Sequence, residues 1–134
     1  MAYRWVCIRD SSPTFTIMAK TRIAGRQYGP KPITITSAAE PAFNTDKANK
    51  FYCALTHDIT DMSTNGTGTP EFGDTLWFMF AVGDTKTINW GSLFEEGENV
   101  PLPTSFDVPA DVKFFDVGFR WNPTNSAWRI VAFA

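Results

Sequence analysis

The feature that most constrains the fold is an alternation of apolar and polar side chains along eight short segments. A period of two residues is typical of β-strands, because successive side chains point to opposite faces of a sheet. Turn-forming pairs such as Gly83-Asp84 separate the segments. The pattern predicts an all-β fold, an antiparallel β-sandwich of jelly-roll or immunoglobulin-like type. The segments are residues 3–9, 14–23, 33–37, 50–56, 75–82, 85–90, 112–121 and 126–133.

Helical periodicity is weak throughout the chain. The best candidates are residues 36–50, where Asn44 or Thr45 would cap a short turn, and residues 92–98. The 134 residues contain no linker or internal repeat. We therefore expect a single domain over residues 1–134, with little helix.

The most specific local prediction is a hairpin in the segment RWNPTNSAWR, residues 120–129. Pro123 suits a type I turn, so a four-residue loop from Pro123 to Ser126 is expected. The resulting register places Trp121 opposite Trp128 on one face of the hairpin. The two rings form either a core contact or an exposed aromatic platform. This register pairs Asn122 with Ala127, Trp121 with Trp128 and Arg120 with Arg129.

The segment TLWFMFAV, residues 75–82, is apolar on both faces. One face of a sandwich sheet normally meets water, so the outer face of this strand, with Trp77 and Met79, needs a cover. The cover is a second subunit, a ligand or a long connection such as residues 91–111. This strand gives the main indication of a partner surface and of a homo-oligomer through Trp77 and Met79.

Charge argues against a nucleic-acid partner. The net charge is -2 and the pI is near 5.3, whereas non-specific nucleic-acid binding depends on neutralising phosphates. Residues 1–31 are nevertheless basic, with six Lys or Arg and one Asp. This N-terminal third suits an anionic membrane surface, or simply forms solvated strand faces.

No apolar run reaches the roughly 18 residues of a membrane span. Arg4 and Arg9 interrupt any signal-peptide core at the N-terminus. The given chain is therefore expected to be cytoplasmic or released by an unconventional route, which would leave the sequon at Asn65 unused.

Two cysteines, Cys7 and Cys53, are too few for a disulfide scaffold and lack CxxC spacing. Both lie in alternating apolar runs. We expect two buried free thiols, with a bridge between neighbouring strands as the alternative.

The stretch DMSTNGTGTPEF, residues 61–72, resembles a calcium loop in spacing, with Asp61, Ser63 and Asn65 at its first, third and fifth positions. An EF-hand loop requires a bidentate acid at position 12, and that position is Phe72. We expect no metal here and a turn in which Asn65-Gly66 takes positive φ angles.

Catalytic residues are poorly supported. His57 is the single histidine, and its neighbour Asp58 would point to the opposite face of a strand. The acids Glu95, Glu96 and Glu98 have the pattern of a solvated loop. We expect no enzyme activity and no cofactor.

The opening AYRWV, residues 2–6, together with the size and acidic pI, resembles aegerolysins, small β-sandwich proteins that bind membrane lipids. The resemblance covers a handful of residues, and the later tryptophan- and cysteine-containing motifs of that family are not found in this chain. It does not establish membership.

Three functions are compatible with these features. The first is non-enzymatic, lectin-like carbohydrate binding, in which aromatic rings stack on sugars and polar groups bind hydroxyls. The alternatives are a structural assembly subunit of a virion or appendage, and a membrane-active, lipid-binding defence protein. The candidate ligand-binding residues are Trp90, Trp121, Asn122, Asn125, Trp128 and Arg129.

Overall fold

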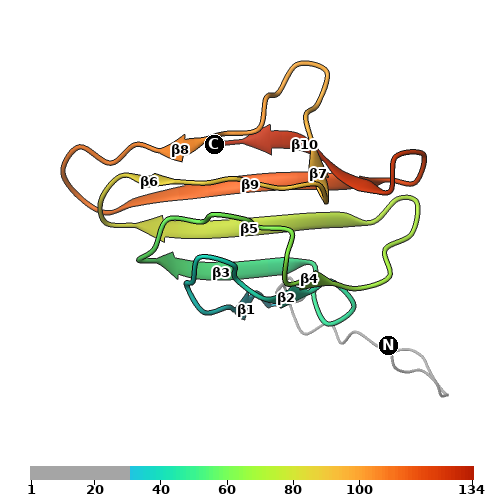
Figure 1. Cartoon of the computed structure of the whole chain (residues 1–134), viewed down its shortest axis with the longest axis horizontal. Coiled ribbons are helices and arrows are strands. Elements are labelled where there is room, and N and C mark those ends of the chain that lie inside the picture. Colours follow the sequence, from blue (N-terminus) through green and yellow to red (C-terminus); the bar gives the residue numbers. More distant parts are fainter. Residues whose placement is uncertain (1–30) are drawn as a thin grey trace, which may run out of the picture. The chain divides into compact units, whose positions relative to one another are not determined.

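The structure, a computed structural model, describes residues 31–134, of which residues 32–134 form one compact unit (Figure 1). This part of the chain is built from strands and contains no helix, so the all-β prediction is confirmed for it. The predicted strands at residues 3–9 and 14–23 lie outside the described residues. The strands are β1 (Ile33–Thr34), β2 (Phe43–Asn44), β3 (Lys50–Leu55), β4 (Gly66–Thr67), β5 (Thr75–Val82), β6 (Lys86–Thr87), β7 (Phe94–Glu95), β8 (Ser105–Phe106), β9 (Lys113–Asn122) and β10 (Ala127–Phe133).

A six-stranded sheet with the order β1-β3-β5-β9-β10-β7 forms the main layer (Figure 1). The pairs β5–β9 and β9–β10 are antiparallel, as expected. The pairs β1–β3, β3–β5 and β10–β7 are parallel, so the prediction of an antiparallel sheet is wrong at these three places. Parallel neighbours require a long crossover, and residues 56–74 supply it between β3 and β5.

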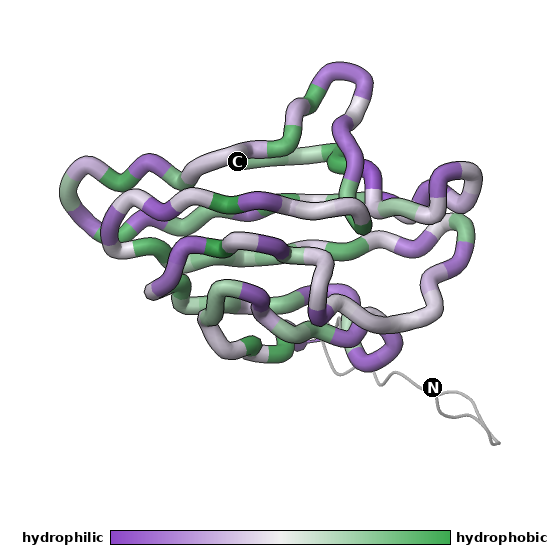
Figure 2. The backbone as a smooth tube through the Cα atoms, in the orientation of Figure 1, coloured by the Kyte–Doolittle hydropathy of each residue, from purple (hydrophilic) through white to green (hydrophobic). Residues whose placement is uncertain are grey.

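The inner face of this sheet carries the core. In β3 and β5 every second side chain is buried on this face. β9 and β10 add Val117, Phe119, Trp128 and Ile130 to it. Loops and two small sheets, β2–β4 and β6–β8, lie over it and add their own buried side chains. Figure 2 shows that hydrophilic residues are concentrated in the connecting loops. The buried residues of this second layer include Phe43, Ile59, Met62, Ile88, Trp90 and Phe106.

Phe78 of β5 lies at the centre of the core and explains the high aromatic content. Its ring contacts rings of both layers, within 6.2 Å between centroids. The closest is Phe43 of β2, at 5.1 Å in an edge-to-face arrangement. Residues far apart in the sequence therefore meet in one aromatic cluster. The other rings around Phe78 are Phe51, Phe80, Trp90, Phe94 and Phe119.

The predicted hairpin is confirmed residue by residue. β9 and β10 pair Asn122 with Ala127, Trp121 with Trp128 and Arg120 with Arg129. The loop closes through Ser126, whose φ angle is 51°. The predicted strand over residues 75–82 also coincides with β5.

The two helical-turn candidates are wrong. Residues 43–44 form β2, and the chain then makes a short turn in which Asn44 Oδ1 accepts a hydrogen bond from the Asp46 amide at 2.9 Å. Residues 94–95 form β7. In both segments a buried phenylalanine, Phe43 or Phe94, packs into the aromatic core, and this tertiary contact overrides the weak helix signal. Asn44 thus closes a turn but caps no helix.

Candidate binding site on the outer face of the sheet

Two of the candidate tryptophans are core residues. Trp90 is 3% exposed and Trp128 is 2% exposed, so the prediction that they offer an exposed stacking surface is wrong. The Trp90 indole donates a hydrogen bond to the carbonyl oxygen of Pro103 at 2.8 Å. Trp121 and Trp128 meet at 5.2 Å in an edge-to-face pair, which is the core alternative for this hairpin.

Strand alternation separates Trp121 from its polar neighbours. Trp121 packs against the core on the inner face, with Trp128. Asn122 and Arg129, each one residue away along its strand, therefore point to the outer face. The six candidate residues thus do not form one surface. The polar members Asn122, Asn125 and Arg129 gather on the outer side, and the three tryptophans do not.

Glu95 organises these polar residues from strand β7, and not from the solvated loop that the sequence predicts. Glu95 accepts hydrogen bonds from Asn122 Nδ2 at 2.6 Å and from Asn125 Nδ2 at 2.8 Å. The Asn122 bond is the largest cause of a lowered pKa at Glu95; the Asn125 bond and nearby Arg129 lower it further, and desolvation opposes them. Arg129 also pairs with Glu98 at 3.3 Å. No sequence signal pointed to Glu95, because its partners are about 30 residues away.

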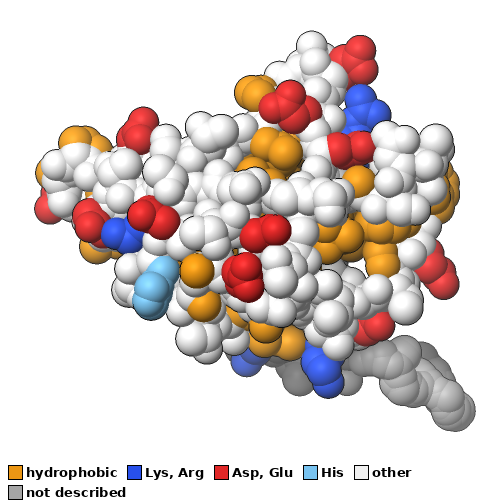
Figure 3. Space-filling model, viewed as in Figure 1, with side chains coloured by type: hydrophobic (Ala, Val, Ile, Leu, Met, Phe, Trp, Pro, Cys, Tyr) orange, Lys and Arg blue, Asp and Glu red, His pale blue; other side chains and the backbone are white. Residues whose placement is uncertain are grey.

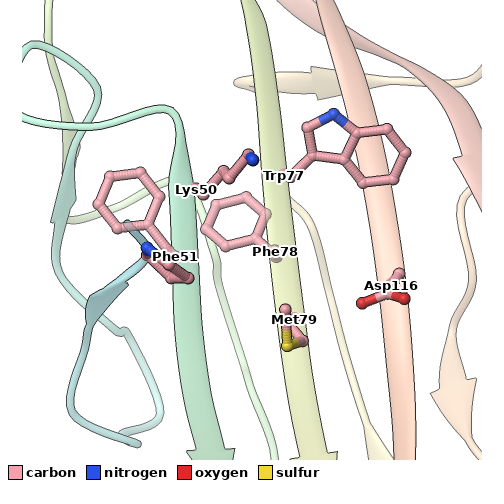
Figure 4. Close-up of a pocket in the computed structure, with 7 residues that line it drawn as sticks. Lys50, Phe51, Trp77, Phe78, Met79 and Asp116 are labelled. Atoms are coloured by element: carbon pink, nitrogen blue, oxygen red, sulfur yellow. The ribbon is translucent and has the colours of Figure 1, made fainter. Parts of the chain in front are cut away.

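The tryptophan of the outer face is Trp77 of β5, which is half-buried. Gly118 lies opposite it on β9, and a Cβ atom at Gly118 would be 2.6–2.7 Å from three consecutive atoms of the Trp77 six-membered ring. Near-equal distances to three atoms mean that the ring lies face-on over the glycine. Figure 4 shows the indole over the β9 ribbon. Only glycine permits this approach, so Gly118 determines how the ring lies.

A cavity of about 330 Å³ opens beside this ring. Lys50 of β3 and Asp116 of β9 border it from two different strands, and Met79 of β5 lies between them (Figure 4). The backbone register places Lys50 beside Trp77, and Met79 between Tyr52 and Asp116. The arrangement combines an aromatic face, a cation and an anion. The lining residues are Pro32, Lys50, Phe51, Trp77, Phe78, Met79 and Asp116.

The loop of residues 61–72 uses its polar side chains internally. Asp61 Oδ1 accepts a hydrogen bond from the Ser63 amide at 2.8 Å, and Asn65 Nδ2 donates to the Glu40 carbonyl at 2.9 Å. A turn is present at Asn65, where the Gly66 amide donates a hydrogen bond to the Ser63 carbonyl oxygen at 3.2 Å. The predicted positive φ angles at Asn65-Gly66 are wrong, because the positive φ of this loop, 127°, belongs to Gly68. Gly66 instead lies in β4, against the Phe43 ring. Within residues 31–134, no three His, Cys, Asp or Glu side chains are grouped to hold a metal ion.

His57 lies exposed on a loop, as predicted. Its Nδ1 is 3.2 Å from Ser37 Oγ and 3.1 Å from Thr56 Oγ1. Asp58 points elsewhere and accepts a hydrogen bond from the Thr87 amide at 2.9 Å. The two residues form no His–Asp couple.

Cys53 is a free, buried thiol, as expected. Burial raises its pKa to about 11. Cys7 lies outside the described residues, as does most of the basic N-terminal third. In residues 31–134, no helix has the length and apolarity that crossing a membrane requires.

Comparisons of the chain with protein-family models, with curated proteins and with solved structures find no match.

Proposed function

We propose that this chain is a non-enzymatic carbohydrate-binding protein and that Trp77 is its stacking platform. The observation that carries the proposal is the face-on packing of the Trp77 ring over Gly118, beside an open cavity. In this arrangement one face of the indole ring packs on the backbone of β9, and the opposite face is available to a ligand. Sugar rings present flat, weakly apolar faces to such a surface.

The charged groups beside the ring suit the hydroxyls of a sugar. Asp116 accepts hydrogen bonds and Lys50 donates them, so hydroxyls on either side of a stacked sugar find a complementary partner. A volume of about 330 Å³ falls at the lower end of small-ligand sites. A monosaccharide unit is therefore the ligand size that the cavity accommodates.

The polar residues at the hairpin extend this face. The pairings Thr75–Arg120, Arg120–Arg129 and Arg129–Glu95 form one row across β5, β9, β10 and β7. This row is next to the row that contains Trp77 and Gly118. A longer glycan stacked on Trp77 would meet Arg129, Asn122 and Asn125 at its next unit. These three residues keep their proposed ligand role, and Trp77 replaces the buried tryptophans.

The test is a broad glycan array, followed by titration of a bound glycan into the whole chain. Trp77→Ala is expected to weaken binding by about 1–3 kcal/mol, the range for an aromatic contact at the centre of an interface. The matched control is Phe114→Ala, which removes a 64% exposed aromatic from the same face but not from the cavity lining. Gly118→Ala keeps Trp77 but displaces its ring, and should weaken binding as well.

The proposal fails if the array shows no glycan, or if Trp77→Ala binds the same glycan unchanged. Release of dye from liposomes that contain anionic lipids and sterols, without glycan binding, would instead favour the membrane-active alternative. Phe72, 83% exposed on the loop before β5, is then the first residue to replace.

A second function, a structural assembly subunit, is favoured by the charges on the same face. Lys50 and Asp116 lie on opposite sides of β5. If two copies pack face to face around a two-fold axis that crosses β5 between Trp77 and Met79, Lys50 of each copy meets Asp116 of the other copy. Met79 is 39% exposed between them. Sedimentation should then show a dimer that Lys50→Glu dissociates and that Lys50→Glu with Asp116→Lys restores. A strict monomer removes this candidate.

The sandwich prediction belongs with these proposals. We infer a two-layer sandwich with a reduced second layer. It is supported by the two small sheets, β2–β4 and β6–β8, over one face of the main sheet. Its mixed strand directions differ from both the jelly-roll and the immunoglobulin-like arrangement.

A further inference from the structure

A second concave site lies at the edge of the sheet, between β1 and the β2–β4 pair. It has a volume of about 420 Å³, larger than the cavity beside Trp77. Within residues 31–134, β1 is an edge strand of the main sheet. Figure 3 shows hydrophobic side chains next to Lys or Arg at this lower border of the molecule. The lining residues are Ile33, Ile35, Ala42, Phe43, Asn44, Lys47, Phe51, Thr64, Asn65 and Thr67.

The floor of this edge groove is apolar. Ile35, Phe43 and Phe51 belong to the core and supply fixed walls. Ile33 of β1 is 39% exposed, although it pairs with the buried Phe51. An apolar ligand that covers Ile33 gains free energy from the water it displaces.

The rim of the edge groove is polar and offers hydrogen-bond donors. Lys47 is the one charged residue among the described lining residues, and it is exposed. Asn44 Oδ1 already accepts a hydrogen bond from the Asp46 amide, which leaves the Nδ2 donors of Asn44 for a ligand. Thr64 adds a hydroxyl. The charge and the donors together favour an anionic group at the rim.

We propose that the edge groove binds a small amphipathic anion, a carboxylate or sulfonate attached to an apolar chain. The chain lies on Ile33, Phe43 and Phe51, and the anionic group meets Lys47 and the Asn44 amide. The edge groove shares only Phe51 with the lining of the Trp77 cavity, and the proposal does not depend on carbohydrate binding.

Calorimetric titration of the whole chain with decanoate and with decylamine tests the proposal. The two probes share a chain of the same kind and differ in the charge of the head group. Decanoate is expected to bind at one site per chain, about tenfold more tightly than decylamine, because Lys47 attracts one head group and repels the other. Equal affinities for the two probes, or no binding up to about 1 mM, would overturn the proposal.

Two substitutions locate the site. Lys47→Gln should weaken decanoate binding about tenfold and remove the preference over decylamine, whereas Lys113→Gln, an exposed lysine on β9, should change neither. Ala42→Phe should abolish decanoate binding, because the phenylalanine ring would fill the edge groove. The matched control is Ala42→Ser, which should bind decanoate normally. Ala42 is exposed, so both variants should keep the fold intact. Unchanged decanoate binding in the folded Ala42→Phe protein contradicts the assignment. Trp77→Ala should bind decanoate normally.

Discussion

At the scale of single residues, Cys53 gives the clearest pH-dependent prediction. Its thiol is 1% exposed, and burial raises its pKa from 9.0 to about 11. The unfolded chain therefore loses this proton at lower pH than the folded protein. Titration of Cys53 should therefore lower the free energy of unfolding as the pH rises from about 9 to about 11. Below pH 9 this thiol should not change the free energy of unfolding with pH.

The measurement is urea unfolding against pH in a Cys7→Ser background, so that one thiol remains. The same background with Cys53→Ala is the control for all other titrating groups, and the difference between the two isolates Cys53. A thiol reagent should also modify the folded protein slowly at neutral pH. Fast modification, or identical pH profiles, would show that Cys53 is accessible.

At the scale of elements, the β9–β10 hairpin contains one locally strained position. Ser126 adopts a φ angle of 51°, in the left-handed region that costs a residue with a side chain about 1–2 kcal/mol. Ser126→Gly should therefore stabilise the protein by about 0.5–1 kcal/mol, less than the full strain because glycine gains entropy in the unfolded chain. The urea midpoint measures the change.

Ser126→Val is the opposite control, because a β-branched residue tolerates this φ angle poorly. It should lower the urea midpoint. If Ser126→Gly and Ser126→Val both lower it, the turn does not have the backbone geometry described.

At the scale of the whole molecule, the aromatic cluster around Phe78 joins the two layers. Phe78 is 1% exposed and contacts Phe43 and Trp90 of the covering layer as well as Phe119 of the sheet. Phe78→Ala should reduce the free energy of unfolding by about 3–5 kcal/mol, from lost burial and an unfilled cavity. Because both layers depend on this ring, tryptophan fluorescence and far-ultraviolet circular dichroism should report one shared transition.

Phe114→Ala serves here too as the control, since this ring is largely exposed and should contribute little. Two separate transitions in the Phe78→Ala protein would mean that the layers unfold independently. A loss of stability no larger than that of the control would mean that the cluster does not hold them together.

The sequence predicts those parts of the candidate site whose residues lie close together along the chain. The hairpin register follows from ten consecutive residues, and it brought Asn122, Asn125 and Arg129 to one end of the sheet. Glu95, which binds both asparagines, is separated from them by 27 and 30 residues. Trp77 was expected to face a partner, but its position over Gly118 depends on the pairing of β5 with β9. The sequence wrongly predicts Trp90 as a ligand-binding residue, because the residues that bury it come from other strands.

The sequence by itself determined the strand character of residues 31–134, the boundaries of β5 and the register of the β9–β10 hairpin. These features follow from side-chain alternation and turn chemistry, which act between residues close in the chain. Tertiary structure decided the strand order, the parallel pairings and which tryptophan lies on the outer face. The physical reason is that Phe43, Phe94 and Trp90 gain more free energy by packing around Phe78 in the core than local propensity offers them elsewhere. Trp77, on the opposite face of the same strand as Phe78, is left half-buried on the outer face of the sheet.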